Sequence, residues 1–219
     1  MTATHKIIFK ILAVSALGFF SFLMLRIIFI YIPVQNDAGF LQLKQSYIHI
    51  TEWRIAFFVH VFSSMFALLA GFTQFSKRLL KKKPALHRAL GYVYVIDVLL
   101  ITGPAGLLMS FYANGGMPSR IAFVLLSVLW ISFTALALYK AVKRDFRAHR
   151  NFMIRSFALT LSAVTLRIWK YLLANLTDIH QMDRYRLIAW LGWTLNLIVA
   201  EIIIYYYFKR RSSGRLIGA

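Results

Sequence analysis

The sequence predicts an all-α integral membrane protein, a bundle of about six transmembrane helices with both termini on the cytoplasmic side. Of its 219 residues, 60% are hydrophobic and only 15% are charged. A soluble domain averages about 45–50% apolar and about 25% charged residues, so this chain lacks the polar surface of a water-soluble globule. Its apolar residues lie in long runs, as membrane-spanning helices require.

Each of these runs is close to the roughly 20 residues that one helical span needs. None shows the segments of about 10 alternating residues that form a membrane β-barrel. No soluble module interrupts the series, so we expect one transmembrane domain over residues 1–219. The first run is too long for the roughly 7–15-residue apolar core of a signal peptide, so we expect an uncleaved span. The predicted spans are residues 7–33, 53–75, 90–111, 121–139, 152–173 and 187–208.

Basic residues predict the orientation. Of the 26 Lys and Arg residues, 17 lie at the amino terminus, in residues 77–88, in residues 140–150 and after Phe208, while the loops on the other side hold 5. Loops rich in Lys and Arg stay in the cytoplasm. We therefore expect both termini and the two basic loops inside.

The net charge of +19 does not predict nucleic-acid binding. The basic residues form short blocks between apolar runs and leave no soluble basic face. Such blocks suit the lipid bilayer and anionic lipid head groups on the cytoplasmic side. The absence of Cys excludes disulfides, thiolate metal sites and Cys nucleophiles, and no phosphate-binding, hydrolase or zinc-protease fingerprint is present.

Ionisable side chains inside the apolar runs are the main functional signal, since each is costly there and usually meets a partner or water. By helix rise, Arg155 and Glu201 lie at similar depths on different spans, which predicts an ion pair. Asp97 is about 15 Å along its span from His87, near the middle of the bilayer. It could carry a proton or hydrogen-bond a neighbouring helix.

Small and polar residues recur at helical spacing along three spans, so each span has one face suited to contact with protein. These faces could meet around a common cavity, or they could simply pack closely. The faces are His60, Ser64, Ala67, Gly71 and Gln74; His87, Gly91, Tyr94, Val98 and Ala105; and His149, Ser156, Thr160, Ala163 and Arg167.

The histidines are the sharpest signal, and they leave two roles open: ligands of a cofactor, or lipid-contact and structural residues at the inner interface. His87 and His149 share the inner depth and belong to different helices, as the two axial ligands of a b-type haem would. His60 lies near the outer side, but the fourth span offers it no partner histidine, so a second haem is not expected. We expect no metal beyond a haem iron.

The arginines beside the inner histidines leave other roles open. Arg88 and Arg150 could contact haem propionates, bind quinone or phosphate groups, or attract anionic lipid head groups at the interface. His60 and Arg167 are further candidate ligand contacts.

Several stretches between His60 and Lys170 form a recognisable series: His60, Ala70–Phe75, Leu86–Val95, Asn114–Gly116, Trp130, Ala148–Thr160 and Ala163–Arg167. In this order they resemble the bacterial membrane-protein family known as domain of unknown function 2306. The resemblance implies a multi-pass protein of the bacterial inner membrane and does not imply a particular reaction. The four-helix di-haem cytochromes b are a looser likeness.

Three functions follow as hypotheses. The first is a small redox protein with one b-type haem that exchanges electrons with quinone. The second is a transporter or channel with a polar path of His60, Asp97 and Arg167, for which Gly103-Pro104 is a candidate helix break. The third is a structural or accessory subunit, in which polar residues only fix helix packing.

Overall fold

The computed structural model describes residues 3–216 and is all-helical, without a strand in that range. Its contacts divide the chain into two compact units, Met1–Arg54 and Ile55–Ala219. The helical membrane bundle expected from the sequence is confirmed, whereas its arrangement as one transmembrane domain stays a prediction.

The first unit consists of a long helix and a folded loop. Helix α1 (Ala3–Phe29) contains the shorter apolar stretch Val14–Phe29 and corresponds to the first predicted span. A 3₁₀ turn, η1 (Gly39–Lys44), follows in the loop. The Phe40 amide donates to the Tyr31 hydroxyl at 3.1 Å, which ties the loop back to the end of the helix.

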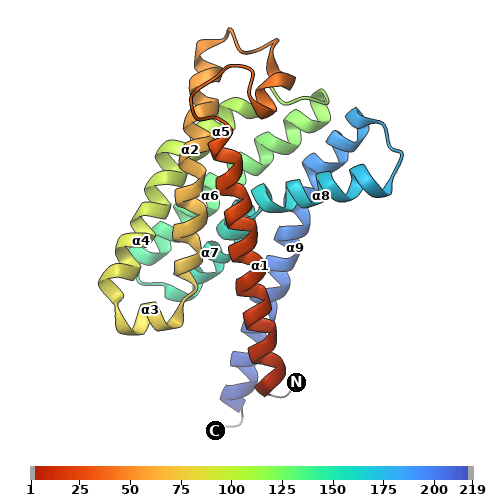
Figure 1. Cartoon of the computed structure of the whole chain (residues 1–219). Helices are drawn as coiled ribbons and strands as arrows, with labels where there is room; N and C mark the ends of the chain where they lie inside the picture. The colour runs from red at the N-terminus through yellow and green to blue at the C-terminus, as the bar shows by residue number, and fades with distance from the viewer. Residues whose placement is uncertain (1–2, 217–219) are drawn as a thin grey trace. The chain divides into compact units, whose positions relative to one another are not determined.

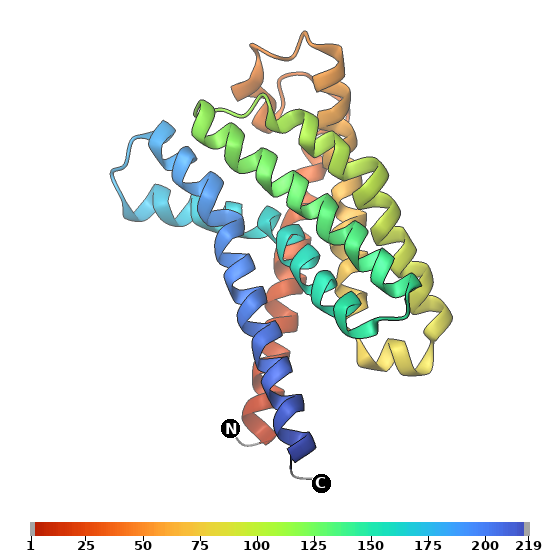
Figure 2. The ribbon, with the colours of Figure 1, turned by 180° about the vertical axis from the view of Figure 1, so that it is seen from behind.

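The second unit holds most of the spans. Five helices of the described chain are long and apolar enough to cross a membrane, at the places where the sequence predicts the second to sixth spans: Thr51–Gln74, Pro84–Ser110, Met117–Val142, Phe146–Leu176 and Gln181–Tyr206. Figures 1 and 2 show the helices that make them, with the short basic helix α3 between the first two. These helices are α2 (Thr51–Gln74), α3 (Lys77–Lys82), α4 (Pro84–Ile96), α5 (Thr102–Ser110), α6 (Met117–Val142), α7 (Phe146–Thr160), α8 (Ser162–Leu176) and α9 (Gln181–Leu216).

Two of these helices begin earlier than their apolar runs. Helix α4 starts at Pro84, which suits a first helical position because its missing N–H has no partner there anyway. Helix α7 follows Asp145, whose carboxylate accepts from the Ala148 amide at 3.1 Å as an N-cap. His87 and His149 therefore lie within their helices, each at the fourth position.

The third span is interrupted. A π-helical turn, η2 (Asp97–Ile101), separates α4 from α5, and the Thr102 amide donates to the Asp97 carbonyl. Pro104 lies just beyond this turn, lacks an N–H and crowds the carbonyl four residues before it, so the regular ladder cannot continue there. The break expected at Gly103-Pro104 thus takes the form of a π-turn.

The fifth span is also interrupted, at a place that the sequence did not predict. Helix α7 ends at Thr160 and α8 starts at Ser162, with no Gly or Pro in between. Figure 1 shows α8 turning away from α7 and running beside α9. The Asn196 side chain donates to the Ala158 carbonyl at 3.0 Å, which satisfies a group that the break frees.

Helix α6 is the centre of the second unit. It packs most extensively against α7 and also contacts α5 and α9. The core there combines aromatic side chains with small residues that let helices approach, as in other membrane bundles. Its buried members include Ala67, Ala70, Tyr94, Val98, Trp130, Ala137, Met153, Phe157, Leu159 and Trp193.

Candidate functional site

The two inner histidines lie together at one end of the second unit. We call this end, formed by residues 77–88 and 140–150, the basic end. His87 of α4 and His149 of α7 are both partly buried there, and they lie close enough for their charges to interact. Residues 62 positions apart are thus brought together by the packing of α4, α6 and α7.

The ring of His149 is held by a backbone group of α6. Its Nδ1 lies 2.8 Å from the Ala137 carbonyl oxygen, and only a protonated nitrogen can donate to that oxygen. In the neutral form of this imidazole the other ring nitrogen, Nε2, carries the lone pair, which is the arrangement of a metal-ligating imidazole. The Nδ1 of His87 is buried and has no hydrogen-bond partner among the described residues.

Two arginines adjoin the histidines. Arg88 is exposed and Arg150 is partly buried. One guanidinium nitrogen of Arg150, Nη2, donates to the Asn151 side chain at 3.5 Å. The basic end therefore offers positive charge beside two imidazoles.

A closed hydrogen-bond network lies deeper between the same helices. The Tyr94 hydroxyl contacts Ser156 Oγ at 2.6 Å and Thr160 Oγ1 at 2.8 Å. Trp130 Nε1 donates to Thr160 Oγ1 at 3.0 Å, and Thr134 Oγ1 lies 2.7 Å from both Ser156 Oγ and the Trp130 carbonyl. These five residues, the hydroxyl network, connect α4, α6 and α7.

The hydrogen-bonding groups of the hydroxyl network are satisfied within the protein. Thr160 donates to the Ser156 carbonyl at 3.2 Å, which leaves its oxygen free to accept from Trp130 and Tyr94. Every hydroxyl proton in the network has an acceptor within the protein, as buried polar groups require, so no bound ligand is needed to accept one. The network locks three helices together and needs no cofactor.

Parts of the three polar faces expected from the sequence meet, and they meet by close packing. The third face is not continuous as expected, because the break at Leu161 leaves His149, Ser156 and Thr160 on α7 and places Ala163 and Arg167 on α8. A Cβ atom on Gly71 would lie 2.5 Å from the Phe157 ring and 3.1 Å from Tyr94. A Cβ on Gly91 would lie 3.1 Å from the Gln74 side chain. Glycine lets α2 approach α4 and α7 at these places, and side chains fill the space between the faces.

His60 lies on the far side of the network from the basic end. Its Nδ1 is 2.9 Å from the Thr102 carbonyl and 3.3 Å from the Thr102 hydroxyl, just beyond the π-turn. Arg167 of α8 lies within electrostatic range of the ring, and Nη1 of Arg167 donates to the Ala163 carbonyl at 2.6 Å. The structure therefore brings His60 and Arg167 together.

Asp97 is separate from that pair. Its side chain is 4% exposed and faces the Ser63 hydroxyl and the backbone of Ala67 on α2. Neither carboxylate oxygen makes a well-formed hydrogen bond to a described residue, nor does the Ser63 hydroxyl. No ion pair among the described residues includes Asp97.

Arg155 and Glu201 form the ion pair that their depths predict. Nε of Arg155 lies 2.5 Å from one carboxylate oxygen and Nη2 lies 2.8 Å from the other. Such two-point pairing fixes geometry as well as charge. The pair joins α7 to α9, so its role in the structure is to hold these helices together.

In the described part of the chain, no group of three or more His, Cys, Asp or Glu could hold a metal ion. The donors that the structure does bring together are the two imidazoles at the basic end.

A family model described as "Predicted membrane protein (DUF2306)" matches residues 57–204, well over half of the chain. The chain belongs to this family. The DUF2306 match confirms the resemblance drawn from the sequence, and the description names a membrane protein without a reaction. No curated protein and no solved structure matches the chain. The likeness to cytochromes b stays a prediction.

The DUF2306 stretches quoted from the sequence supply most of the hydroxyl network. Tyr94, Trp130, Ser156 and Thr160 all lie in them, and only Thr134 does not. Sequence reasoning placed three of these on inward faces but missed that Trp130 and Thr134 complete the network. The available signal was a tryptophan within a span, whose buried N–H usually needs a partner.

Proposed function

We propose that this DUF2306 protein is a small membrane redox protein that holds one b-type haem between His87 and His149. The observation that carries the proposal is the meeting of these residues at the basic end, each at the fourth position of its helix. Two imidazoles from different helices are a common axial ligand set for haem iron.

The donor chemistry fits that group. The Ala137 carbonyl fixes His149 so that Nε2 can coordinate, and His87 has a buried nitrogen without a partner. Arg88 and Arg150 offer guanidinium groups that pair well with carboxylates such as haem propionates.

A haem bound there would supply one-electron exchange, with quinone as the proposed partner. The chain's own residues would hold the cofactor and limit water. On the membrane side of the histidines, the Phe157 ring packs 5.2 Å from the rings of both Phe72 and Phe75, centroid to centroid. This apolar cluster would shield the ligands from water penetration along the bundle.

The proposal is tested by the absorption spectrum of protein made in cells supplied with haem. His87→Ala and His149→Ala should each abolish the Soret band and the sharp reduced bands. His180→Ala, at the opposite end before α9, is the matched control and should leave the spectrum unchanged. A spectrum that survives in both inner variants would refute the ligand assignment.

We also propose that the basic end faces the cytoplasm of a bacterial cell and that the protein resides in the inner membrane. The excess of Lys and Arg in the two basic loops supports this orientation. At that interface, anionic lipid head groups would meet Arg88 and Arg150 when no other anion is bound.

A second candidate function is transport, because two spans are interrupted within the membrane. Discontinuous helices often line substrate sites in transporters. The π-turn at Asp97–Ile101 and the break at Leu161 are such interruptions, and His60 with Arg167 lies near the first. Uptake into proteoliposomes that persists in Asp97→Asn would count against this path.

A further inference from the structure

Asp97 takes no part in the hydroxyl network or in the proposed haem site. It lies about 15 Å along the span from His87 by helix rise, and its side chain is buried and forms no ion pair within the described part of the chain. A carboxylate at this depth is costly unless a cation or a polar partner compensates its charge. The described chain supplies no such cation.

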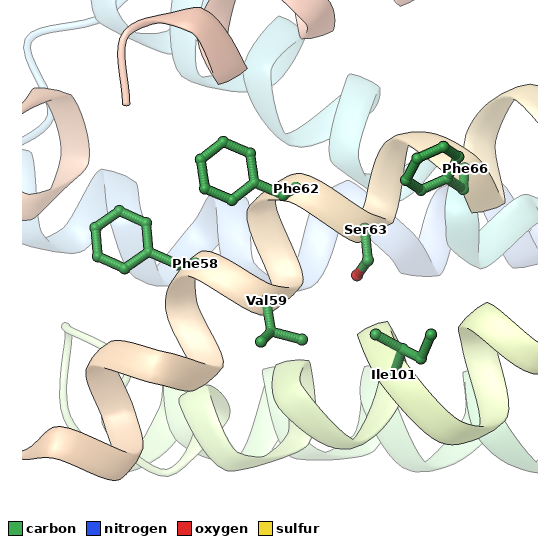
Figure 3. Close-up of a pocket in the computed structure, with 6 residues that line it drawn as sticks. All are labelled: Phe58, Val59, Phe62, Ser63, Phe66 and Ile101. Carbon is green, nitrogen blue, oxygen red and sulfur yellow. The ribbon is translucent and has the colours of Figure 1, made fainter. Parts of the chain in front are cut away.

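A groove on α2 is lined by Ser63, whose hydroxyl faces this carboxyl group. It has a volume of about 400 Å³ and an almost wholly apolar lining. Figure 3 shows its walls, with Phe62 and Ser63 on α2 and Ile101 on the facing helix. The lining residues are Phe58, Val59, Phe62, Ser63, Phe66 and Ile101.

Ser63 connects the groove to Asp97. Its side chain lines the groove, and its hydroxyl faces the Asp97 carboxylate on the inner side. In Figure 3 this hydroxyl points toward the helix that carries Ile101. Ile101 is the last residue of the π-turn that begins at Asp97, so the groove runs along that turn.

The aromatic side chains follow one face of α2. Phe58, Phe62 and Phe66 are spaced by four residues, and the first two rings are nearly parallel with centroids 6.1 Å apart. Aromatic faces attract organic cations, and the attraction is larger where water is excluded. The groove thus has aromatic walls and one negative group behind a hydroxyl.

We propose that this groove binds a lipophilic organic cation, which enters from the lipid with its aromatic or aliphatic part against the phenylalanines. The cationic centre lies nearest Ser63 and is attracted by the Asp97 carboxylate. The lining residues themselves carry no charge, and the nearest charged group shown beside them is Asp97, which lies behind Ser63. Charge complementarity to this carboxylate decides for a cation over a neutral lipid. A Coulomb attraction of this kind is strong in a medium of low dielectric constant.

The proposal does not depend on the haem. It names a substrate class for the transport candidate and concerns binding only. The probe is therefore tetraphenylphosphonium, a delocalised aromatic cation, and the readout is its saturable binding to the purified full chain in lipid nanodiscs.

Asp97→Asn keeps the shape of the side chain and removes the charge, so it should weaken binding by about tenfold or more. Asp183→Asn is the matched control, because Asp183 lies at the start of α9, is exposed and pairs with Arg186 at 2.8 Å. It should bind as the unmodified protein does.

Val59→Trp is the second variant, and it leaves Asp97 intact. Val59 is 37% exposed and lines the groove, so the larger ring should fill the groove without disturbing the core. Binding should be lost while the melting temperature stays unchanged. Equal affinity in Asp97→Asn and the unmodified protein, or no saturable binding to the unmodified protein, would overturn the proposal.

Discussion

The Nδ1 atom of His149 lies 2.8 Å from the carbonyl oxygen of Ala137. This hydrogen bond sets the tautomer of the imidazole and its orientation relative to α6, one turn into α7. The ring is thus held by another helix, although the residue lies near a helix end. The structure thus gives one member of the histidine pair a fixed geometry.

Tyr94→Phe should destabilise the bundle, because the hydroxyl joins α4 to Ser156 and Thr160 of α7. Interhelical hydrogen bonds in a membrane protein contribute on average about 0.6 kcal/mol each, so we expect a loss of about 1–2 kcal/mol. Denaturant-induced unfolding in mixed micelles measures it. Tyr92→Phe, at an exposed tyrosine of the same helix, should change nothing, and an equal loss in both variants would contradict a role for the network.

The Arg155–Glu201 pair should show energetic coupling. In a cycle of Arg155→Met, Glu201→Gln and the double variant, each single change leaves one group without its partner, so the double variant should lose less stability than the sum. The expected coupling is about 0.5–3 kcal/mol, the range for residues in direct contact. The exposed Asp183–Arg186 pair should couple by about 1 kcal/mol or less. Additive effects at Arg155 and Glu201 would mean that the pair does not hold α7 to α9.

Asn196→Leu should weaken the junction of α7 and α8. The amide donates to the Ala158 carbonyl and to Thr165 Oγ1 at 3.1 Å, and leucine leaves both acceptors without it. An unsatisfied buried acceptor costs about 1–3 kcal/mol. Thermal unfolding in detergent measures the change. Asn175→Leu, whose exposed amide bonds only within its own helix, is the control and should melt as the unmodified protein does.

The predicted orientation has a direct test because the chain contains no Cys. A single cysteine can therefore be labelled without background. In intact cells, a membrane-impermeant maleimide should label Asp178→Cys, in the loop before α9, and should fail to label Lys143→Cys, in the basic loop after α6. Both should react after the membrane is disrupted. The reverse pattern in intact cells would place the basic end outside.

The spans and the ion pair could be predicted because they depend on local composition and on helix rise. Arg155 and Glu201 pair as their shared depth indicates. The starts of α4 and α7 could not be placed from hydropathy. Helix α4 begins at Pro84 and α7 begins after the N-cap Asp145, but the first residues of both helices are polar, so the apolar runs begin only at Leu90 and Phe152.

The break at Leu161 was beyond sequence reasoning for a physical reason. Its stability depends on a side chain 35 positions later, Asn196, which replaces a lost backbone partner. The same holds for the hydroxyl network, since Trp130 and Thr134 gain their roles only when α6 packs between α4 and α7. Hydrogen-bond partners so far apart in the sequence do not produce a recognisable local pattern of residues.

The central claim is the haem, and an absorption spectrum of the purified protein tests it most directly. Protein from haem-supplied cells, measured oxidised and then reduced with dithionite, should show a Soret band and sharp reduced α and β bands that vanish in His149→Ala. A featureless spectrum from such cells would contradict the claim. The histidines of the basic end would then be interface residues, and transport or a structural role would become the favoured function.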